Sequence, residues 1–347
     1  MRSTLLPVSL FCSLVSTFST HYSDHDDRRS SGPIWTELAD IARGPRQEHS
    51  VTAVGADVYI IGGIPYFQFN PASGVAPPTL DLVDVYSSVN NTWHAAAPIP
   101  KAINHGNVAT VNNKVYVLGA MAGDIWSGIP DCFEYTPETN TWKTLPPMPS
   151  GQGRGASAVG VRGSIVYIAG GLITLNVFTT QEVTVNTVTS YNVETMEWAV
   201  LPSLPEGRDH VGGAVIGDIF YVVGGRVNGI ENVRNTVFAL DLESPQKGWV
   251  QKAPMPTARG GLSTSHIDSM IYAIGGEGNK TLVLPNGVYN EVEAYNTESD
   301  SWTKLSPMPK PRHGTNAAAV LDCIFIPGGS NVAALSAVAT NDKFCIC

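Results

Sequence analysis

Four histidines stand in short polar runs and could act as acids or bases. The runs are Glu48-His49, Asn104-His105, Arg208-Asp209-His210 and Arg312-His313. An imidazole beside a carboxylate or another polar group can take or give a proton near neutral pH. If the protein is an enzyme, the catalytic candidates are therefore His49, His105, His210, His313, Arg208 and Asp209. The alternative is that each is an ordinary hydrogen-bonded residue.

The elements that would position these histidines follow from a repeat. Six glycine marks recur every 51 to 57 residues, and they are Gly62-Gly63, Gly119-Ala120, Gly170-Gly171, Gly224-Gly225, Gly275-Gly276 and Gly328-Gly329. A repeat of about 50 residues is typical of a propeller built from small sheets. The first unit shows the pattern, with strands predicted over His49–Val54, Val58–Ile61 and Leu82–Tyr86 and a fourth that begins at Trp93.

A tyrosine precedes a tryptophan by seven residues in four of the units. The pairs are Tyr86/Trp93, Tyr135/Trp142, Tyr191/Trp198 and Tyr295/Trp302, while the fourth unit has Leu240 and Trp249 instead. We expect a hairpin to place both rings where one blade packs on the next. Proline-rich exits such as Pro147-Met148-Pro149 follow.

These residues resemble the kelch repeat, over roughly residues 33–347. The resemblance implies an all-β fold, a β-propeller with four strands a blade, and the six glycine marks predict six blades. The sixth glycine mark has no tryptophan after it, and Trp35 precedes the first mark. We therefore predict that the N-terminal strand around Trp35 completes the last blade and closes the ring, which removes an open sheet edge.

Loops on one face of such a propeller carry unusual apolar residues. The predicted loops between strands two and three include Ile64–Leu80, Met121–Pro130 and Leu172–Asn186, and they emerge on the same face as the histidine runs. Exposed loops seldom carry so many apolar groups without a partner. The predicted ligand contacts are Tyr66, Phe67, Phe69, Trp126, Phe178 and Leu282. The alternative is that these loops pack on one another.

The N-terminus indicates secretion. Residues 1–19 read as a signal peptide, and residues 20–32 as a flexible segment before the propeller. Secretion makes the cysteines relevant, and Cys323 and Cys345 or Cys347 would be neighbours in the last blade, with Cys323–Cys345 the preferred disulfide. Asn90 and Asn279 begin glycosylation sequons in predicted loops.

Composition and missing motifs exclude several functions. A net charge of −9 argues against nucleic-acid binding, and no apolar run is long enough to span a membrane. The chain has no G-x-S-x-G, H-E-x-x-H, C-x-x-C or Walker sequence, so we expect no cofactor and no metal. The expected partner is a small apolar molecule, a glycan or a protein on the loop face of a monomer.

Two hypotheses of different classes follow. The first is a secreted kelch propeller that binds a ligand or partner on its apolar loop face. The second comes from a resemblance in size and layout to small secretory kelch proteins of fungal natural-product pathways. It implies an enzyme or accessory protein that cyclises or isomerises a polyketide or terpenoid intermediate with acid–base residues at the channel mouth.

Overall fold

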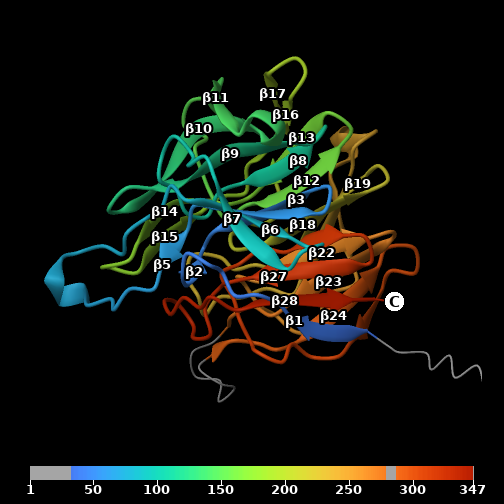
Figure 1. The fold of residues 1–347 in the computed structure, drawn as a ribbon. Helices are drawn as coiled ribbons and strands as arrows, with labels where there is room; N and C mark the ends of the chain where they lie inside the picture. Colours follow the sequence, from blue (N-terminus) through green and yellow to red (C-terminus); the bar gives the residue numbers. More distant parts are fainter. Residues whose placement is uncertain (1–32, 279–286, 347) are drawn as a thin grey trace, which may run out of the picture. The chain divides into compact units, whose positions relative to one another are not determined.

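The computed structural model describes residues 33–278 and 287–346, which form six antiparallel blades and one two-stranded sheet (Figure 1). Each of the first three blades is a four-stranded meander. Blade 1 consists of β3 (Ser50–Val54), β4 (Asp57–Ile61), β6 (Val83–Ser87) and β7 (Thr92–Ala96). Blade 2 contains β8 (Val108–Val111), β9 (Lys114–Ala122), β10 (Trp126–Thr136) and β11 (Thr141–Leu145). Blade 3 consists of β12 (Ala158–Arg162), β13 (Ile165–Ala169), β16 (Val188–Asn192) and β17 (Glu197–Leu201).

The other three blades repeat this order. Blade 4 consists of β18 (Gly212–Ile216), β19 (Ile219–Val223), β20 (Val237–Asp241) and β21 (Trp249–Lys252). Blade 5 consists of β22 (Ser263–Ile267), β23 (Met270–Ile274), β24 (Val292–Asn296) and β25 (Ser301–Lys304). Blade 6 consists of β26 (Ala318–Val320), β27 (Cys323–Pro327), β28 (Asn341–Cys345) and β1 (Ile34–Glu37).

The first strands of the blades contact one another in a closed cycle. In this cycle β3 contacts β8, then β12, β18, β22 and β26 follow, and β26 contacts β3 again. These strands therefore surround a central channel, and the predicted six-bladed propeller is confirmed. Within the described residues, no helix is long and apolar enough to cross a membrane.

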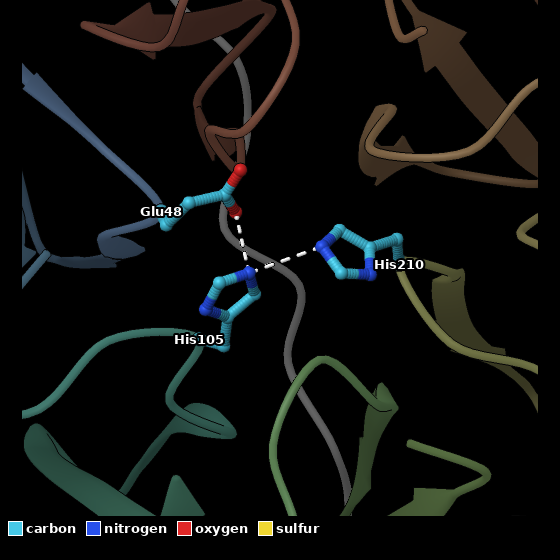
Figure 2. Close-up of side chains that lie close together, drawn as sticks. All are labelled: Glu48, His105 and His210. Carbon is cyan, nitrogen blue, oxygen red and sulfur yellow. Dashed lines mark hydrogen bonds and ion pairs between the residues drawn. The ribbon is translucent and has the colours of Figure 1, made fainter. Parts of the chain in front are cut away.

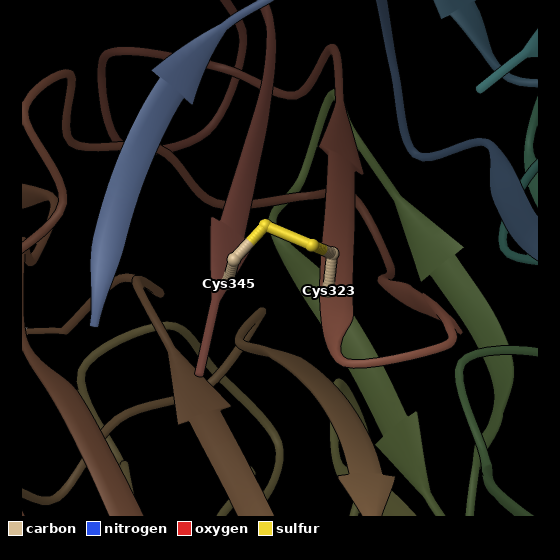
Figure 3. The surroundings of a disulfide bond; sticks show 2 residues. All are labelled: Cys323 and Cys345. Carbon is tan, nitrogen blue, oxygen red and sulfur yellow. A yellow bond between two sulfur atoms is a disulfide. The ribbon is translucent and has the colours of Figure 1, made fainter. Parts of the chain in front are cut away.

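Blade 6 joins the two ends of the propeller. Strand β1 pairs antiparallel with β28, with Trp35 opposite Phe344 and their ring centroids 5.0 Å apart. This confirms the predicted closure. A disulfide links Cys323 of β27 to Cys345 of β28, which are directly paired residues (Figure 3). The blade that contains the N-terminal strand is thus also cross-linked.

The spaced aromatic residues pack between blades, as predicted. Tyr86 and Trp93 of blade 1 lie in one core cluster with Phe325 of blade 6, and the indole N–H of Trp93 donates to the Ala39 carbonyl. Leu240 takes the tyrosine position in blade 4, and there Trp249 packs on Phe220. Burial of such apolar surface between neighbours is the main source of stability in a repeat array.

Two predicted loops are wrong, because they contain strands. Residues 121–130 belong mostly to β9 and β10, which stay paired beyond the blade up to Ala122 opposite Ser127. Residues 172–186 form a hairpin of β14 (Leu172–Asn176) and β15 (Gln181–Thr184), and β14 pairs with β10. The added hairpin satisfies the backbone groups that the protruding end of β10 would otherwise leave unpaired. A smaller pair, β2 (Arg46–Gln47) and β5 (Ile64–Pro65), lies beside blade 1.

Buried arginines at the start of five of the six repeats hold strands together, and blade 2 has Ile103 at this position. They are Arg46, Arg154, Arg208, Arg259 and Arg312. Arg312, for example, donates to the Ile326 carbonyl of β27 and to Asp342 of β28. These contacts support a structural role for the arginines, including Arg208, which the sequence had made a catalytic candidate.

Candidate functional site

Each blade contributes one residue that lies at the channel and has a left-handed backbone conformation. The six are Glu48, His105, Ala156, His210, Gly261 and Gly314, with φ between 46° and 62°. Their backbone groups bond around the axis, because five of the six N–H groups, all but that of His210, donate to the carbonyl of the equivalent residue in a neighbouring blade. The five bonds are Glu48 to Gly314, His105 to Glu48, Ala156 to His105, Gly261 to His210 and Gly314 to Gly261. We call these six residues the axial ring.

Three members of the axial ring carry side chains that can do chemistry. Glu48, His105 and His210 are largely buried, whereas the other positions hold alanine or glycine. A left-handed backbone costs free energy in residues other than glycine and is tolerated best by asparagine, aspartate and histidine. Such residues cluster at functional sites, so the ring is the first place to look for one.

The three side chains converge on the axis from blades 1, 2 and 4 (Figure 2). The Nε2 atoms of His105 and His210 lie 3.0 Å apart, and His105 Nε2 lies 3.1 Å from Glu48 Oε2. One ligand-type atom from each of the three residues falls within 4.8 Å of the others. We call Glu48, His105 and His210 the axial triad.

The outer nitrogens of both rings are anchored. His105 Nδ1 lies 2.6 Å from Asn104 Oδ1, whose amide nitrogen donates to Thr79, so the oxygen faces the ring. His210 Nδ1 lies 2.7 Å from Asp209 Oδ1. Since both partners are acceptors, each Nδ1 carries the proton, and the Nε2 atoms turn toward the axis.

Arg226 lies beside the axial triad in a network of buried carboxylates. Its guanidinium pairs with Glu182 at 3.0 Å, with Asp209 at 3.2 Å and with Glu277, and it lies 3.3 Å from His210 Nε2. Burial alone would lower the pKa of Arg226, but Glu277, Glu182 and Asp209 raise it above its ordinary value. Arg226 therefore stays charged and fixes the carboxylates around the histidines.

The two histidines differ in basicity. Burial lowers the pKa of His105, although Glu48 opposes this effect. Burial and Arg226 act in the same direction on His210, but the hydrogen bond and charge of Asp209, with Glu48, raise its pKa above the ordinary value. Burial would raise the pKa of Glu48, yet His105 and the other imidazoles lower it. His210 thus holds a proton more readily than His105.

A cavity of about 700 Å³ opens above the axial triad. Its floor is Glu48, His105, His210 and Arg226, and its walls are mostly apolar. The apolar wall residues are Phe69, Pro71, Trp126, Leu175, Val177, Phe178, Ile230, Ala334 and Leu335. The rings of Phe69 and Phe178, which come from separate loops, lie 5.9 Å apart. We call this cavity the cup.

Two polar atoms at the cup have no partner among the described residues. They are Nε1 of Trp126, a residue that is 2% exposed, and Oε2 of Glu182. A buried donor or acceptor without a partner costs about 1–3 kcal/mol, so such atoms are rare unless something else satisfies them. Both residues line the cup, so a molecule bound there is one way to satisfy this donor and this acceptor.

The predicted ligand contacts divide into two groups. Phe69, Trp126 and Phe178 line the cup, although Trp126 lies in β10 and not in an exposed loop. Tyr66 is 57% exposed and lies outside the cup, and Phe67 lines a narrow crevice against Pro77. Leu282 and the sequon at Asn279 lie outside the described residues. Asn90 is exposed in the turn between β6 and β7.

The predicted catalytic residues also divide into those that lie at the cup and those that lie elsewhere. His105 and His210 form the floor, and Asp209 supports His210 from behind. His49 faces a smaller inner cavity and bonds the Pro327 carbonyl, and burial lowers its pKa to about 3. His313 bonds the Val332 carbonyl and approaches Glu277 at 3.4 Å. Arg208 bonds Glu206 and Thr236 within the blade, so the structure does not bring it to the cup.

Arg226, Glu277 and Glu182 were missing from the predicted site. The first two carry a signal in the sequence, since each directly follows a glycine pair. The equivalent residues of the other blades are Ile64, Met121, Leu172 and Ser330, so charge at this position is the departure from the repeat. Glu182 lies in the added hairpin, which has no counterpart in the repeat and hence no such signal.

Fold and site together define a class of protein, a six-bladed propeller with a pocket at one end of its channel. The chain matches the KLHDC2/KLHL20/DRC7 Kelch-repeats domain over residues 155–345 and the Kelch motif over residues 104–149. The first match covers more than half of the chain, which therefore belongs to the kelch-repeat family.

Relatives among characterised proteins agree with this assignment. Kelch-like protein terF of Aspergillus terreus (strain NIH 2624 / FGSC A1156) is 39% identical over 306 residues, covering 86% of this chain and 65% of that protein. Kelch-like protein 25 of Xenopus tropicalis is 26% identical over 278 residues, covering 76% and 41%. The chain thus spans less than two thirds of these relatives' lengths. The solved structure titled "Structure of YjhT" has 17% identity, a TM-score of 0.69 and coverage of 88% and 95%, which shows the fold alone.

Proposed function

We propose that this propeller binds a small, largely apolar molecule that carries oxygen atoms, in the cup above the axial triad. The observation that carries the proposal is the combination of apolar walls with two unpartnered polar atoms, Trp126 Nε1 and Glu182 Oε2. A cavity of about 700 Å³ lies within the usual range for small-molecule sites, which are mainly apolar with a few placed polar groups.

The two free atoms define what the molecule must offer. Trp126 Nε1 donates, so it requires an acceptor such as a carbonyl or ether oxygen. Glu182 Oε2 accepts when the carboxylate is ionised and can donate when it is protonated, and burial raises the pKa of this group. Both states suit a hydroxyl, and the paired rings of Phe69 and Phe178 suit a flat body.

Two flavonoid probes test the proposal directly. The protein is titrated with 7-hydroxyflavone and with flavone, which lacks the hydroxyl, and the affinity of each is measured from the quenching of tryptophan fluorescence. We expect 7-hydroxyflavone to bind more tightly. Trp126→Phe and Glu182→Ala should each weaken it by about tenfold, the cost of roughly one hydrogen bond. Tyr66→Ser, outside the cup, is the matched control. Equal affinities for both probes in all variants would reject the cup as the site.

An acid–base enzyme is the second candidate, favoured by the imidazole pair on the floor. His105 Nε2 would take a proton from one position of the bound molecule and protonated His210 would give one at another position. The product is then an isomer, and a proton passing between the two rings, 3.0 Å apart, restores the protein. Such a step suits cyclisation or isomerisation in a fungal secondary-metabolite pathway.

Deletion in the producing organism tests this candidate. The deletion strain, complemented with the wild type or with His210→Asn, is compared by mass spectrometry of its metabolites. An isomer of unchanged mass should accumulate in the deletion and the His210→Asn strains. Complementation by His210→Asn equal to the wild type would contradict the acid–base role.

We also propose that the protein passes through the secretory pathway. The Cys323–Cys345 disulfide suits an oxidising compartment, and the Asn90 sequon is exposed. The test is to treat the protein with a glycosidase and measure its mass. We expect the treatment to decrease the mass, and to decrease it less in Asn90→Gln. A protein that retains its first 19 residues and carries no glycan would contradict the proposal.

A further inference from the structure

The lone-pair atoms of the axial triad face one another with no proton assigned between them. Because both Nδ1 atoms carry protons toward Asn104 and Asp209, the two Nε2 atoms are acceptors whenever the rings are neutral. Glu48 Oε2, also an acceptor, lies 3.1 Å from His105 Nε2. Three acceptors at this spacing repel one another unless a proton or a metal ion lies among them, and a metal ion can bind all three at once.

We propose that Glu48, His105 and His210 bind a divalent transition-metal ion, Zn²⁺ or Fe²⁺, at the floor of the cup. Two imidazoles and one carboxylate are the ligand set of many zinc enzymes and of the facial triad of non-haem iron proteins. Ligand atoms about 2.1 Å from an ion on perpendicular bonds lie about 3.0 Å apart, close to the two spacings that His105 Nε2 makes with His210 and Glu48, and all three ligand atoms lie within 4.8 Å of one another.

The second shell matches what metal-binding histidines require. A histidine that binds a metal nearly always donates its other ring N–H to an oxygen, which fixes its orientation. Asn104 and Asp209 provide those oxygens at 2.6 Å and 2.7 Å. Asp209 is itself held by Arg226 and Thr184, so the second ring is supported by a network and not by a single contact.

The charge balance of the buried floor also calls for a cation. Its charged groups besides the imidazoles are Glu48, Glu182, Asp209, Glu277 and Arg226, with a formal charge of −3 from four carboxylates and one guanidinium. Their side chains are at most 11% exposed. Buried charge without compensation is costly, and a divalent ion would reduce −3 to −1. Arg226, 3.3 Å from His210 Nε2, does not balance this set alone.

Space for the remaining ligands lies on both sides of the triad. The inner cavity of about 50 Å³ and the cup share Glu48, His105 and His210 as lining residues. Since the other axial-ring residues are Ala156, Gly261 and Gly314, the ring itself places no large side chain over the ion, and Arg226 lies to one side, 3.3 Å from His210 Nε2. An oxygen of the molecule in the cup can then bind the ion directly. An ion that occupies both Nε2 lone pairs excludes a proton passing between the rings, so this inference competes with the acid–base candidate.

Metal titration of the full chain tests the site. The protein is dialysed against a chelator, then titrated with Zn²⁺ in a calorimeter, with Fe²⁺ under anaerobic conditions, and with Co²⁺ followed by visible absorption. We expect one ion per chain. Glu48→Gln, His105→Asn and His210→Asn should each weaken binding at least a hundredfold, and asparagine tolerates the left-handed backbone at the two histidine positions. His94→Asn, at an exposed position of β7, is the control and should bind like the wild type.

A measurement on the wild type covers the case in which a variant fails to fold. X-ray absorption of the Co²⁺-loaded protein should show two imidazoles in the first shell. Fewer than two, no stoichiometric binding, or unchanged binding in folded His105→Asn and His210→Asn would overturn the metal site. The flavone titration is repeated with chelator present. Retained 7-hydroxyflavone binding in that sample would leave the cup as a ligand site even if no metal binds.

Discussion

The Nε2 atoms of His105 and His210 lie 3.0 Å apart although these residues belong to blades 2 and 4. Blade 3 separates the two blades along the ring, and at the equivalent position it carries Ala156. A larger side chain there would occupy the inner cavity that all three residues line. The contact between the histidines therefore depends on a residue that has no chemistry of its own.

Gly314 should fix the position of the Glu48 carboxylate. A Cβ at residue 314 would meet Glu48 Oε1, and the residue has φ +62°. Gly217 has φ +57° with nothing within 4 Å, so it isolates the backbone cost. We expect Gly217→Ala to destabilise by about 1 kcal/mol and Gly314→Ala by at least about 1 kcal/mol more, measured by urea unfolding. Equal losses would show that Glu48 can move freely.

Arg226 should stabilise the whole floor of the cup. Arg226→Met leaves Glu182, Asp209 and Glu277 buried without their cation, which should cost about 3–5 kcal/mol in the free energy of unfolding. The control is Lys247→Met, since Lys247 is exposed and 4.0 Å from Asp241, and it should change stability by less than about 0.5 kcal/mol. A loss below about 1 kcal/mol for Arg226→Met would contradict this account.

Strand β1 should stabilise the ring as a whole. A chain that starts at Ala39 lacks Trp35, whose ring packs on Phe344, and leaves β28 as an open edge. We expect it to lose about 3 kcal/mol or more relative to a chain that starts at Pro33 and retains β1. Thermal unfolding of both chains is the measurement. Identical melting temperatures would mean that β1 contributes nothing to closure.

Glu206 should make the free energy of unfolding depend on pH in the acidic range. Hydrogen bonds and charge from Arg234 and Arg208 lower its pKa from 4.5 to about 2. Its contribution is therefore complete above about pH 4.5 and is lost as the pH falls toward 2. The side chain is 41% exposed, so solvent screening limits this contribution to at most about 1 kcal/mol. Between pH 4.5 and about 2, the free energy of unfolding of Glu206→Gln should fall less steeply than that of the wild type. An equal slope in both proteins would argue against the ion pairs of Glu206.

The features that could be predicted from the sequence are those that repeat from blade to blade. The glycine marks and the Tyr/Trp spacing occur in nearly every blade, so they predicted the fold and the closure by Trp35. The axial ring repeats as well, but its members differ in chemistry and share only a left-handed backbone. No single residue type predicts that conformation, so the ring could not be found in the sequence. His105 and His210 could be predicted as candidates, while their contact with Glu48 required the geometry of three blades.

The added hairpin shows where the sequence signal ends. Residues 172–186 diverge from the repeat, so their apolar pattern fitted an exposed loop as well as a paired strand. Pairing of β14 with the end of β10 is a long-range contact, and it buries Trp126 and places Glu182 on the cup. Arg226 and Glu277 could have been found by comparing the residues that follow the glycine pairs.

The number of blades sets which side chains can meet. Equivalent residues of a closed ring lie at one distance from the axis, and this distance grows with each blade added. With a seventh blade, the same glutamate and two histidines would stand farther apart across a wider channel. The count of repeats thus determines the reactivity of this centre as directly as the residues that compose it.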